Sequence, residues 1–384
     1  MGEKWHSRLA WTVGLMVMVL LLVACAAPAA PTPTPSAKPA AQAPTPQPPQ
    51  PTAAVKAAAP SPTLAPLSPP VTVRVAVYGS IGDGAIYIAQ DKGYFKEQGL
   101  QVEMSVFGTT AESIPLLGSE KMEVTRGVGS AGLFNAIVRG IPLKIVADSG
   151  RTYKGSGYIA IVLQKELIDS GQVKGFSDLK GRKFAVAGAG TGSLFERLMH
   201  TALAKGSLSP KDASLSNFSM ADAMSAMGSK SIDGAVLAEP LVTQGVERGL
   251  FVRWQGLDDL LPDEQHTWLI YAPSFAEKSP EAAKRFMVAY LKGARDYMDA
   301  IKLGKDKENV INVLVKYTSV KEPALFSKMI YPAVDPNGGI DKPSITRMID
   351  WNTGQGYITG KLDINTMVDD QFLKFALGQI GESR

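Results

Sequence analysis

Residues 71–104 read VTVRVAVYGSIGDGAIYIAQDKGYFKEQGLQVEM, and this stretch decides the fold. Its first seven residues are apolar nearly throughout, as in a strand that is covered on both faces. A turn, Tyr-Gly-Ser-Ile-Gly, follows at 78–82. We then expect a helix at 83–92, which stops at Lys92-Gly93, and a second strand at 101–107. A strand, a helix and a strand in this order predict the start of a parallel sheet.

The same alternation continues along the chain and predicts an α/β fold with two lobes, each a mostly parallel sheet flanked by helices. Lobe 1 is expected to comprise residues 71–158 and 265–384, and lobe 2 residues 159–264. Further strands are expected at 122–128, 143–147, 157–164, 183–187, 214–218, 232–237 and 266–272. Further helices are expected at 110–118, 130–139, 192–204, 220–227, 281–303, 306–317, 321–331, 343–358 and 364–378. The last five helices should cover lobe 1.

The first 25 residues have the pattern of an export signal rather than of a folded element. Lys4 and Arg8 precede an apolar run that is shorter than the ~20 residues a membrane-spanning helix needs. The run ends in Leu-Val-Ala-Cys at 22–25, which resembles the lipobox of bacterial lipoproteins, so we expect Cys25 to be lipidated. The alternative is an ordinary signal peptide with an incidental cysteine. A lipid on Cys25 would anchor the protein to the cell membrane, facing outside the cytoplasm.

Residues 26–70 are a spacer in this interpretation. They contain 15 of the 26 prolines, with Ala, Thr, Gln and Ser between them. Such a segment cannot bury a core, so we expect a disordered linker with polyproline II character that holds the folded part away from the membrane.

The composition excludes several classes of protein. Cys25 is the single cysteine, so no disulfide can form within the chain. The three histidines (His6, His200 and His266) lack metal-ligand spacing, and we expect the last two to be solvated or hydrogen-bonded. A net charge of +4 without a dense basic stripe argues against nucleic-acid binding. We therefore expect no metal, no cofactor and no nucleic acid, and a monomeric protein.

Four stretches of sequence together resemble one family. They are IYIAQDKGYFKEQGLQVEM, GVGSAGLFNAIVRGIPLKIVAD, FSDLKGRKFAV, and IDGAVLAEP followed by GVERG, in this order over residues 71–300. In these stretches the chain resembles the substrate-binding proteins of ABC importers for nitrate, sulfonate, taurine and thiamine-precursor substrates. The resemblance implies the type II periplasmic-binding-protein fold, a small-molecule ligand held between the lobes, and permease and ATPase subunits as partners. Closure would occur at a hinge near 158–160 and 264–268.

Ligands of open α/β sheets bind at the carboxyl ends of the strands, where helix N-termini present free N–H groups. The turns at those ends give the candidate ligand-binding residues Tyr78, Gly79, Ser80, Phe107, Thr109, Gly129, Ser130, Asp148, Tyr153, Gly190, Thr191, Ser193 and Glu239. For the glycines the alternative is simple turn chemistry, and for the aromatic residues it is packing. We expect the turn at 78–80 to face the turn at 190–193.

The glycine-rich turn at 188–192 and Arg126 could each be interpreted in more than one way. The glycines at 188–192 lack the full dinucleotide-binding fingerprint, because Ser193 stands where the third glycine belongs. Arg126 lies inside a strand that should be buried, so it is either an ion-paired core residue or a reader of an anionic group.

The charged residues expected at the strand ends are Asp148, Arg151 and Glu239, which do not form a convergent cationic pocket. This favours a neutral heterocyclic ligand, such as riboflavin or a thiamine pyrimidine precursor. A sulfonate, taurine or nitrate is the alternative. An enzyme on the same fold, for pyrimidine-precursor synthesis, is disfavoured. Such enzymes need a catalytic His, or Cys and a metal, whereas this chain has no Cys after Cys25 and no paired His. A sensor or surface adhesin is a third option.

Overall fold

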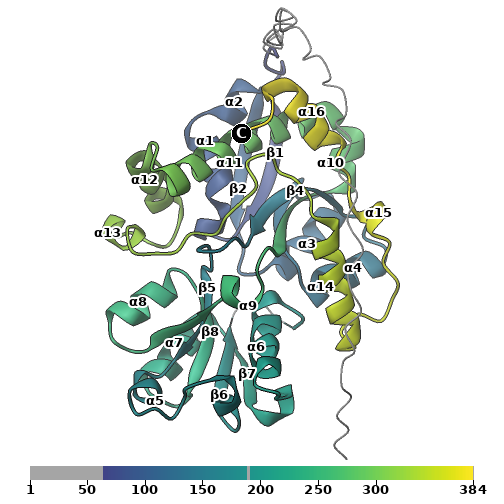
Figure 1. The fold of residues 1–384 in the computed structure, drawn as a ribbon. Coiled ribbons are helices and arrows are strands. Elements are labelled where there is room, and N and C mark those ends of the chain that lie inside the picture. The colour runs from purple at the N-terminus through teal and green to yellow at the C-terminus, as the bar shows by residue number, and fades with distance from the viewer. Residues whose placement is uncertain (1–63, 188–190, 384) are drawn as a thin grey trace, which may run out of the picture. The chain divides into compact units, whose positions relative to one another are not determined.

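The computed structural model describes residues 64–187 and 191–383. These residues form two five-stranded sheets with helices on their faces (Figure 1), and both sheets belong to one compact unit. We call the parts built around the two sheets lobe 1 and lobe 2. The predicted cleavable signal (residues 1–25), its Cys25, and most of the predicted linker lie outside the described residues, as does Gly190.

The sheet of lobe 1 has the strand order β2-β1-β3-β10-β4. Four of its strands run parallel, and β10 runs antiparallel to its two neighbours. The strands are β1 (Val71–Val77), β2 (Leu100–Val106), β3 (Val124–Val128), β4 (Lys144–Arg151) and β10 (Gln265–Tyr271). The apolar run at 71–77 forms a strand because Val73, Val75 and Ala76 are fully buried in the core.

The sheet of lobe 2 repeats this plan with the order β7-β6-β8-β5-β9, in which β5 is the antiparallel strand. Its strands are β5 (Ile159–Leu163), β6 (Lys183–Ala187), β7 (Ser214–Phe218), β8 (Gly234–Ala238) and β9 (Val252–Gly256). The sequence patterns did not predict β9, whose residues are only half buried because it is an edge strand.

The two crossing points between the lobes determine where a hinge can lie. The chain leaves β4 at Arg151 and enters β5 at Ile159, and it leaves α9 (Leu257–Leu260) and enters β10 at Gln265. The connecting segments are therefore 152–158 and 261–264, just before the two antiparallel strands. Ligand-dependent bending there remains a prediction.

The remaining helices connect the strands or cover lobe 1. In lobe 1 they are α1 (Gly84–Asp91), α2 (Tyr94–Glu97), α3 (Thr110–Gly118) and α4 (Ala131–Val138). In lobe 2 they are α5 (Lys165–Asp169), α6 (Leu194–Lys205), α7 (Met220–Gly228) and α8 (Leu241–Glu247). Beyond β10 they are α10 (Pro273–Lys278), α11 (Pro280–Leu303), α12 (Lys307–Tyr317), α13 (Pro323–Phe326), α14 (Lys342–Gly354), α15 (Ile364–Met367) and α16 (Gln371–Ile380).

The long helix α11 is the main cover of lobe 1, and it packs against α1. Gly293 allows this close approach, because a Cβ atom there would lie 2.2 Å from the carbonyl oxygen of Ala85. Phe286 on the same helix is fully buried and stacks on Phe95 with ring centroids 4.7 Å apart. Burying one such side chain contributes about 1.5–3 kcal/mol.

Several predicted boundaries were wrong, each because a tertiary contact overrides a local pattern. The helix expected at 321–331 ends at Phe326, because the chain then runs along lobe 1 and Ala333 accepts a hydrogen bond from Arg151 N. The helix expected at 364–378 breaks between α15 and α16, because Val368 pairs with Ile145 of β4. The linker expected to end at 70 is already tied to lobe 1 earlier, since Leu67 N donates to Gln98 O and Arg285 donates to Ala65 O.

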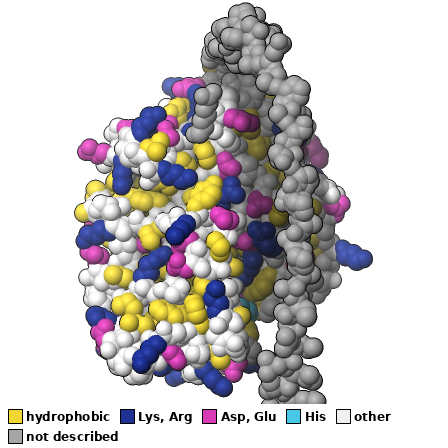
Figure 2. Space-filling view, viewed as in Figure 1, with side chains coloured by type: hydrophobic (Ala, Val, Ile, Leu, Met, Phe, Trp, Pro, Cys, Tyr) yellow, Lys and Arg dark blue, Asp and Glu magenta, His cyan; other side chains and the backbone are white. Residues whose placement is uncertain are grey.

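None of the helices in the described part of the chain combines the length and the apolarity that crossing a membrane requires. On the face shown in Figure 2, basic and acidic side chains are interspersed.

Candidate functional site

A cavity of about 230 Å³ lies between the two lobes. Its lining comes from the turn after β1, the start of α3, the strand β3, the start of α4, the crossing segment, and lobe 2. The lining residues are Tyr78, Ser80, Ile81, Gly82, Gly108, Thr109, Thr110, Ala111, Arg126, Val128, Ser130, Tyr158, Phe195, Ala238 and Glu239. The cavity therefore occupies the place at the carboxyl ends of β1, β3 and β8 where an α/β fold binds ligands.

Helix N-termini converge on this cavity. Thr109 is the N-cap of α3 and has extended backbone angles without a side-chain capping bond. Ser130 is the N-cap of α4, and its hydroxyl accepts a hydrogen bond from Leu133 N at 3.4 Å. Because the first N–H groups of a helix carry partial positive charge, both ends favour a negatively charged ligand group.

Arg126 is the cation of the cavity. Its side chain extends from β3, only 3% of the residue is exposed, and Nε donates to the carbonyl oxygen of Ser149 at 3.3 Å. Burial lowers the pKa of Arg126, but the nearby Asp83 carboxylate and tyrosines outweigh this and raise it overall. The guanidinium group therefore keeps its charge inside the cavity wall.

Gly82 makes room for this guanidinium group. A Cβ atom built on Gly82 would lie 2.5, 2.7 and 2.9 Å from Nη2, Cζ and Nη1 of Arg126. The backbone of the turn and the plane of the guanidinium group are thus in direct contact, which fixes where Arg126 can lie.

Asp83 holds the turn that carries Gly82. Its Oδ2 atom accepts hydrogen bonds from Tyr78 N and Ser80 N, both at 3.0 Å. The same oxygen accepts weaker bonds from the hydroxyls of Ser80 and Tyr87 at 3.2 and 3.3 Å. Asp83 is 1% exposed, and Oδ1 has no hydrogen-bond partner among the described residues.

Glu239 is the carboxylate that lobe 2 contributes to the lining. Its two oxygens accept hydrogen bonds from Thr243 N at 3.0 Å and from Thr243 Oγ1 at 2.9 Å. Ile330 N, from the segment that follows α13, donates to the same carboxylate at 3.4 Å and so links the two lobes. Burial raises the pKa of Glu239.

The cavity brings together some of the residues that the sequence suggested. Of the predicted ligand-binding residues, it includes Tyr78, Ser80, Thr109, Ser130 and Glu239. Their contact with a ligand remains a prediction. Arg126, which the sequence left open between an ion-paired core residue and a reader of an anionic group, also lines it, as does Tyr158.

Other suggested residues lie elsewhere. Asp148 is not at a strand end but inside β4, fully buried, where it accepts a hydrogen bond from Gln265 Nε2 at 2.6 Å. Tyr153 lines a separate cavity near the crossing segment, with Lys302 Nζ 4.5 Å from its ring centre. Gly79, Phe107 and Gly129 belong to the expected turns but are outside the lining.

The described residues of the turn at 190–193 are outside the cavity lining, and the expected placement of this turn opposite the turn at 78–80 remains a prediction. Ser193 is fully buried as the N-cap of α6, and Thr191 is exposed. Gly192 O accepts a hydrogen bond from Asn352 Nδ2 of α14 at 3.1 Å. Phe195, in the first turn of α6, does line the cavity, and no sequence pattern marks it beyond its place in a predicted helix.

No group of three or more His, Cys, Asp or Glu side chains in residues 64–187 and 191–383 could hold a metal ion. His200 packs edge-on against Trp351, and its pKa is lowered by burial.

His266 is fully buried beside the cavity, with its ring 5.9 Å from that of Tyr158. Burial, together with the positive charges of Arg126 and Arg151, lowers the pKa of His266 to about 3. In the unfolded chain His266 binds a proton below the ordinary histidine pKa of about 6.5, whereas in the folded protein the buried ring stays neutral. The stability that a neutral His266 confers is therefore lost as the pH falls from about 6.5 towards 3.

Between pH 7 and pH 5 the free energy of unfolding of the parent protein should fall because of His266. In His266→Gln we expect this fall to be smaller by about 2 kcal/mol. Urea unfolding of both proteins at the two pH values measures this difference. Asp148, whose pKa is raised to about 6 by burial, acts in the opposite direction but is present in both proteins. If both proteins lost the same free energy of unfolding between pH 7 and pH 5, the lowered pKa of His266 would not be the cause of this pH dependence.

The fold described above is that of type II periplasmic binding proteins. The aliphatic sulphonate binding protein SsuA from Escherichia coli has a TM-score of 0.64 at 14% identity, over 78% of this chain and 92% of that one. The nitrate-binding protein NrtA from Synechocystis has a TM-score of 0.66 at 16% identity, over 81% and 89%. The desulfurization enzyme DSZB shares the fold at a TM-score of 0.59 and 13% identity, over 81% and 99%. At these identities the similarity shows the fold alone.

The sequence comparison gives the family. The family model described as NMT1/THI5-like matches residues 83–300, which is more than half of the chain, so the protein belongs to this family. Relatives from Brucella abortus and Brucella suis are 25% identical over 244 residues, covering 62% of this chain and 68% of theirs. They are provisionally named binding proteins, and their names state no ligand.

Proposed function

We propose that this protein is the solute-binding component of an ABC importer and that it captures a small ligand with an acidic group. The observation that carries the proposal is the buried Arg126, which lines the interlobe cavity together with the N-termini of α3 and α4. Such donors bind a carboxylate, sulfonate or nitrate through charge-assisted hydrogen bonds. Family membership and the fold shared with solute-binding proteins support the transport role.

The rest of the lining suggests what the acidic group is attached to. Ile81, Ala111, Val128, Phe195 and Ala238 provide apolar walls from both lobes. A ligand with a short alkyl or aryl part would bury that part against them, at about 25 cal/mol per Å² of apolar surface. We therefore place an organic sulfonate or carboxylate first among the ligand classes.

A neutral heterocyclic vitamin or precursor is the second candidate. Our sequence-based preference for riboflavin or a thiamine pyrimidine precursor depended on the lack of a cation at the strand ends. Arg126 provides that cation, so we now place an acidic ligand before a neutral heterocycle. The observation that still favours a ring is the set of aromatic side chains around the cavity (Tyr78, Tyr158 and Phe195).

The proposal includes the cellular setting. We infer that lipidation of Cys25 anchors the protein on the outer side of the cell membrane, as a monomer that delivers its ligand to permease and ATPase subunits. The lipobox-like sequence at 22–25 and the proline-rich segment after it support this. Metabolic labelling with a radioactive fatty acid tests it: the parent protein should be labelled and Cys25→Ala should not, and equal labelling of both would contradict it.

Ligand binding itself is tested by a thermal-shift screen of the purified protein. The panel contains alkane- and arylsulfonates, taurine, nitrate, short carboxylates, riboflavin and pyrimidine precursors. A true ligand at 100-fold excess over its Kd stabilises the folded state by about 2.7 kcal/mol. If only riboflavin or the pyrimidines raise the melting temperature, the acidic-ligand proposal is wrong. Chemical turnover of a panel member would instead indicate an enzyme, the class to which DSZB belongs.

The contact between Gly82 and Arg126 makes a specific prediction for an acidic ligand. Gly82→Ala should raise its Kd by about 10-fold or more, because the new methyl group must displace the guanidinium group from its position. Titration calorimetry measures the change. Gly228→Ala, at the end of α7 and outside the cavity, is the control, because a Cβ atom there would meet no neighbouring side chain within 4 Å, and it should leave the Kd unchanged. Equal Kd values for Gly82→Ala and the parent protein would show that Arg126 is not held by this contact.

A further inference from the structure

Asp83 is the second formal charge on the lobe 1 side of the cavity, and the turn places it next to the residue that touches Arg126. It follows Gly82 directly in the chain, and the guanidinium group lies on Gly82. Asp83 and Arg126 are 1% and 3% exposed, so water screens neither charge effectively.

The distribution of hydrogen bonds shows that this carboxylate is a fixed part of the site. Oδ2 is anchored by Tyr78 N and Ser80 N of the turn, so Asp83 cannot rotate away without releasing two backbone N–H groups. Oδ1 is buried without a partner among the described residues. Asp83 acts on Arg126 through its charge rather than through a hydrogen bond, so it does not occupy the guanidinium N–H groups.

The two buried charges of the lobe 1 side, Arg126 and Asp83, thus offset each other before a ligand binds, and the exposed Glu112, which accepts from Gly108 N and Thr109 Oγ1, adds a further negative charge at the start of α3. A ligand with one negative charge gains the hydrogen bonds of Arg126 and of the helix N-termini against the repulsion of a single buried carboxylate. A ligand with two negative charges meets that repulsion twice and finds no second cation among the described lining residues. Glu239, on the lobe 2 side, accepts three hydrogen bonds within the protein and adds no positive charge.

We propose that Asp83 is a specificity-determining residue that restricts this site to singly charged anions and excludes doubly charged ones, phosphate monoesters and phosphonates among them. This inference rests on the proposed function, because it concerns the same cavity and the same acidic ligand. It concerns the charge that the ligand carries, whereas the proposed function concerns the presence of an acidic group.

The direct test uses two probes of nearly the same shape at pH 8. Benzenesulfonate carries one negative charge and phenylphosphonate carries two. Titration calorimetry of the full-length protein should give a Kd for benzenesulfonate about 50-fold or more below that for phenylphosphonate. Equal affinities would overturn the inference and leave the proposed function standing. Absence of binding by both probes, while a neutral heterocycle binds, would overturn the acidic-ligand proposal and the inference with it.

Two variants assign the discrimination to a residue. Asp83→Asn keeps an oxygen that can accept from Tyr78 N and Ser80 N but removes the charge, so the ratio of the two Kd values should fall to about 5-fold or less. Glu239→Gln removes the competing carboxylate of lobe 2, and the ratio should fall less in it than in Asp83→Asn. Asp169→Asn, at an exposed carboxylate of α5 outside the cavity, is the control and should leave the ratio unchanged. If Asp83→Asn does not fold, as judged by its thermal melt, loss of the whole ratio in Glu239→Gln would still show that the wrong carboxylate was assigned.

Discussion

Replacing Arg126 by methionine should raise the Kd of an acidic ligand by about 100-fold or more, the largest effect on binding that we expect from a single change. Methionine fills a similar volume but removes both the charge and the donors from a buried wall. Truncating one partner of a buried, hydrogen-bonded charge pair costs about 2–5 kcal/mol of binding free energy. Titration calorimetry with the best ligand of the screen measures the loss.

The controls separate loss of the site from loss of the fold. Arg151→Met removes an arginine that lies outside the cavity and pairs with Asp335 at 3.1 Å, so the Kd should stay unchanged. Arg126→Lys keeps a charge without the planar fork and should bind with intermediate affinity. A folded Arg126→Met variant that binds the ligand as tightly as the parent protein would refute the role of Arg126.

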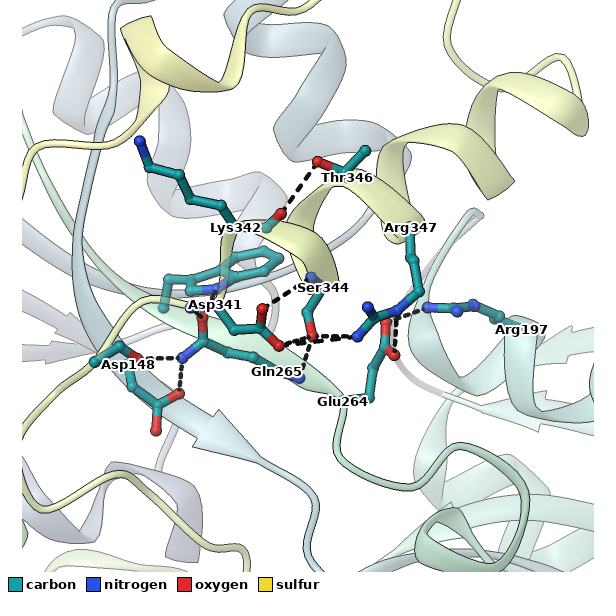
Figure 3. Close-up of polar contacts among 11 residues, drawn as sticks. Asp148, Arg197, Glu264, Gln265, Asp341, Lys342, Ser344, Thr346 and Arg347 are labelled. Carbon is teal, nitrogen blue, oxygen red and sulfur yellow. Dashed lines mark hydrogen bonds and ion pairs between the residues drawn. The ribbon is translucent and has the colours of Figure 1, made fainter.

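Glu264→Ala should lower the free energy of unfolding by about 3–4 kcal/mol, the largest effect on stability that we expect. Glu264 is 3% exposed and lies in the second crossing segment, just before β10. One of its oxygens pairs with Arg197 Nη1 of α6 at 2.6 Å, and the other with Arg347 Nε of α14 at 3.1 Å. Figure 3 shows the two arginines reaching this carboxylate from the two lobes. Its removal leaves Arg197, whose side chain is 11% exposed, without a counter-charge.

Arg347 contributes less to this loss, because its side chain is 46% exposed and solvent screens it. The network continues through Ser344, whose hydroxyl accepts from Arg347 Nη2 and donates to Asp341, both at 2.6 Å. Urea unfolding measures the effect. Asp169→Ala is the control: it breaks an exposed pair with Lys165 of the same 2.6 Å length and should cost about 0.5 kcal/mol or less. Similar losses in both variants would show that burial does not strengthen the Glu264 pairs.

The sequence predicted those parts of the fold in which burial on both faces leaves a continuous apolar run. The strand at 71–77 and the helix at 110–118 have the bounds that the pattern indicated. Patterns failed where a distant partner decides the local structure. Residues near Val368 leave the helix because β4 offers a pairing partner, and the half-polar strand β9 exists because β5 is beside it.

In the candidate site, too, features set by local sequence could be predicted and features set by distant residues could not. Turns after strands could be identified locally, and Tyr78, Ser80, Thr109 and Ser130 do line the cavity. The role of Arg126 could not be decided from its strand alone, because it depends on Gly82 and Asp83 from a different turn. Asp148 was misplaced because β4 extends to Arg151, so a residue that looked like a strand end is in the core.

The most direct test of the account is a crystal structure of the protein with the sulfonate or carboxylate that binds most tightly in the screen. We predict that the acidic group lies in the interlobe cavity, within hydrogen-bond distance of the Arg126 guanidinium group and of backbone N–H groups at the starts of α3 and α4. Density for the ligand outside this cavity, or inside it with the acidic group directed away from Arg126, would contradict the account.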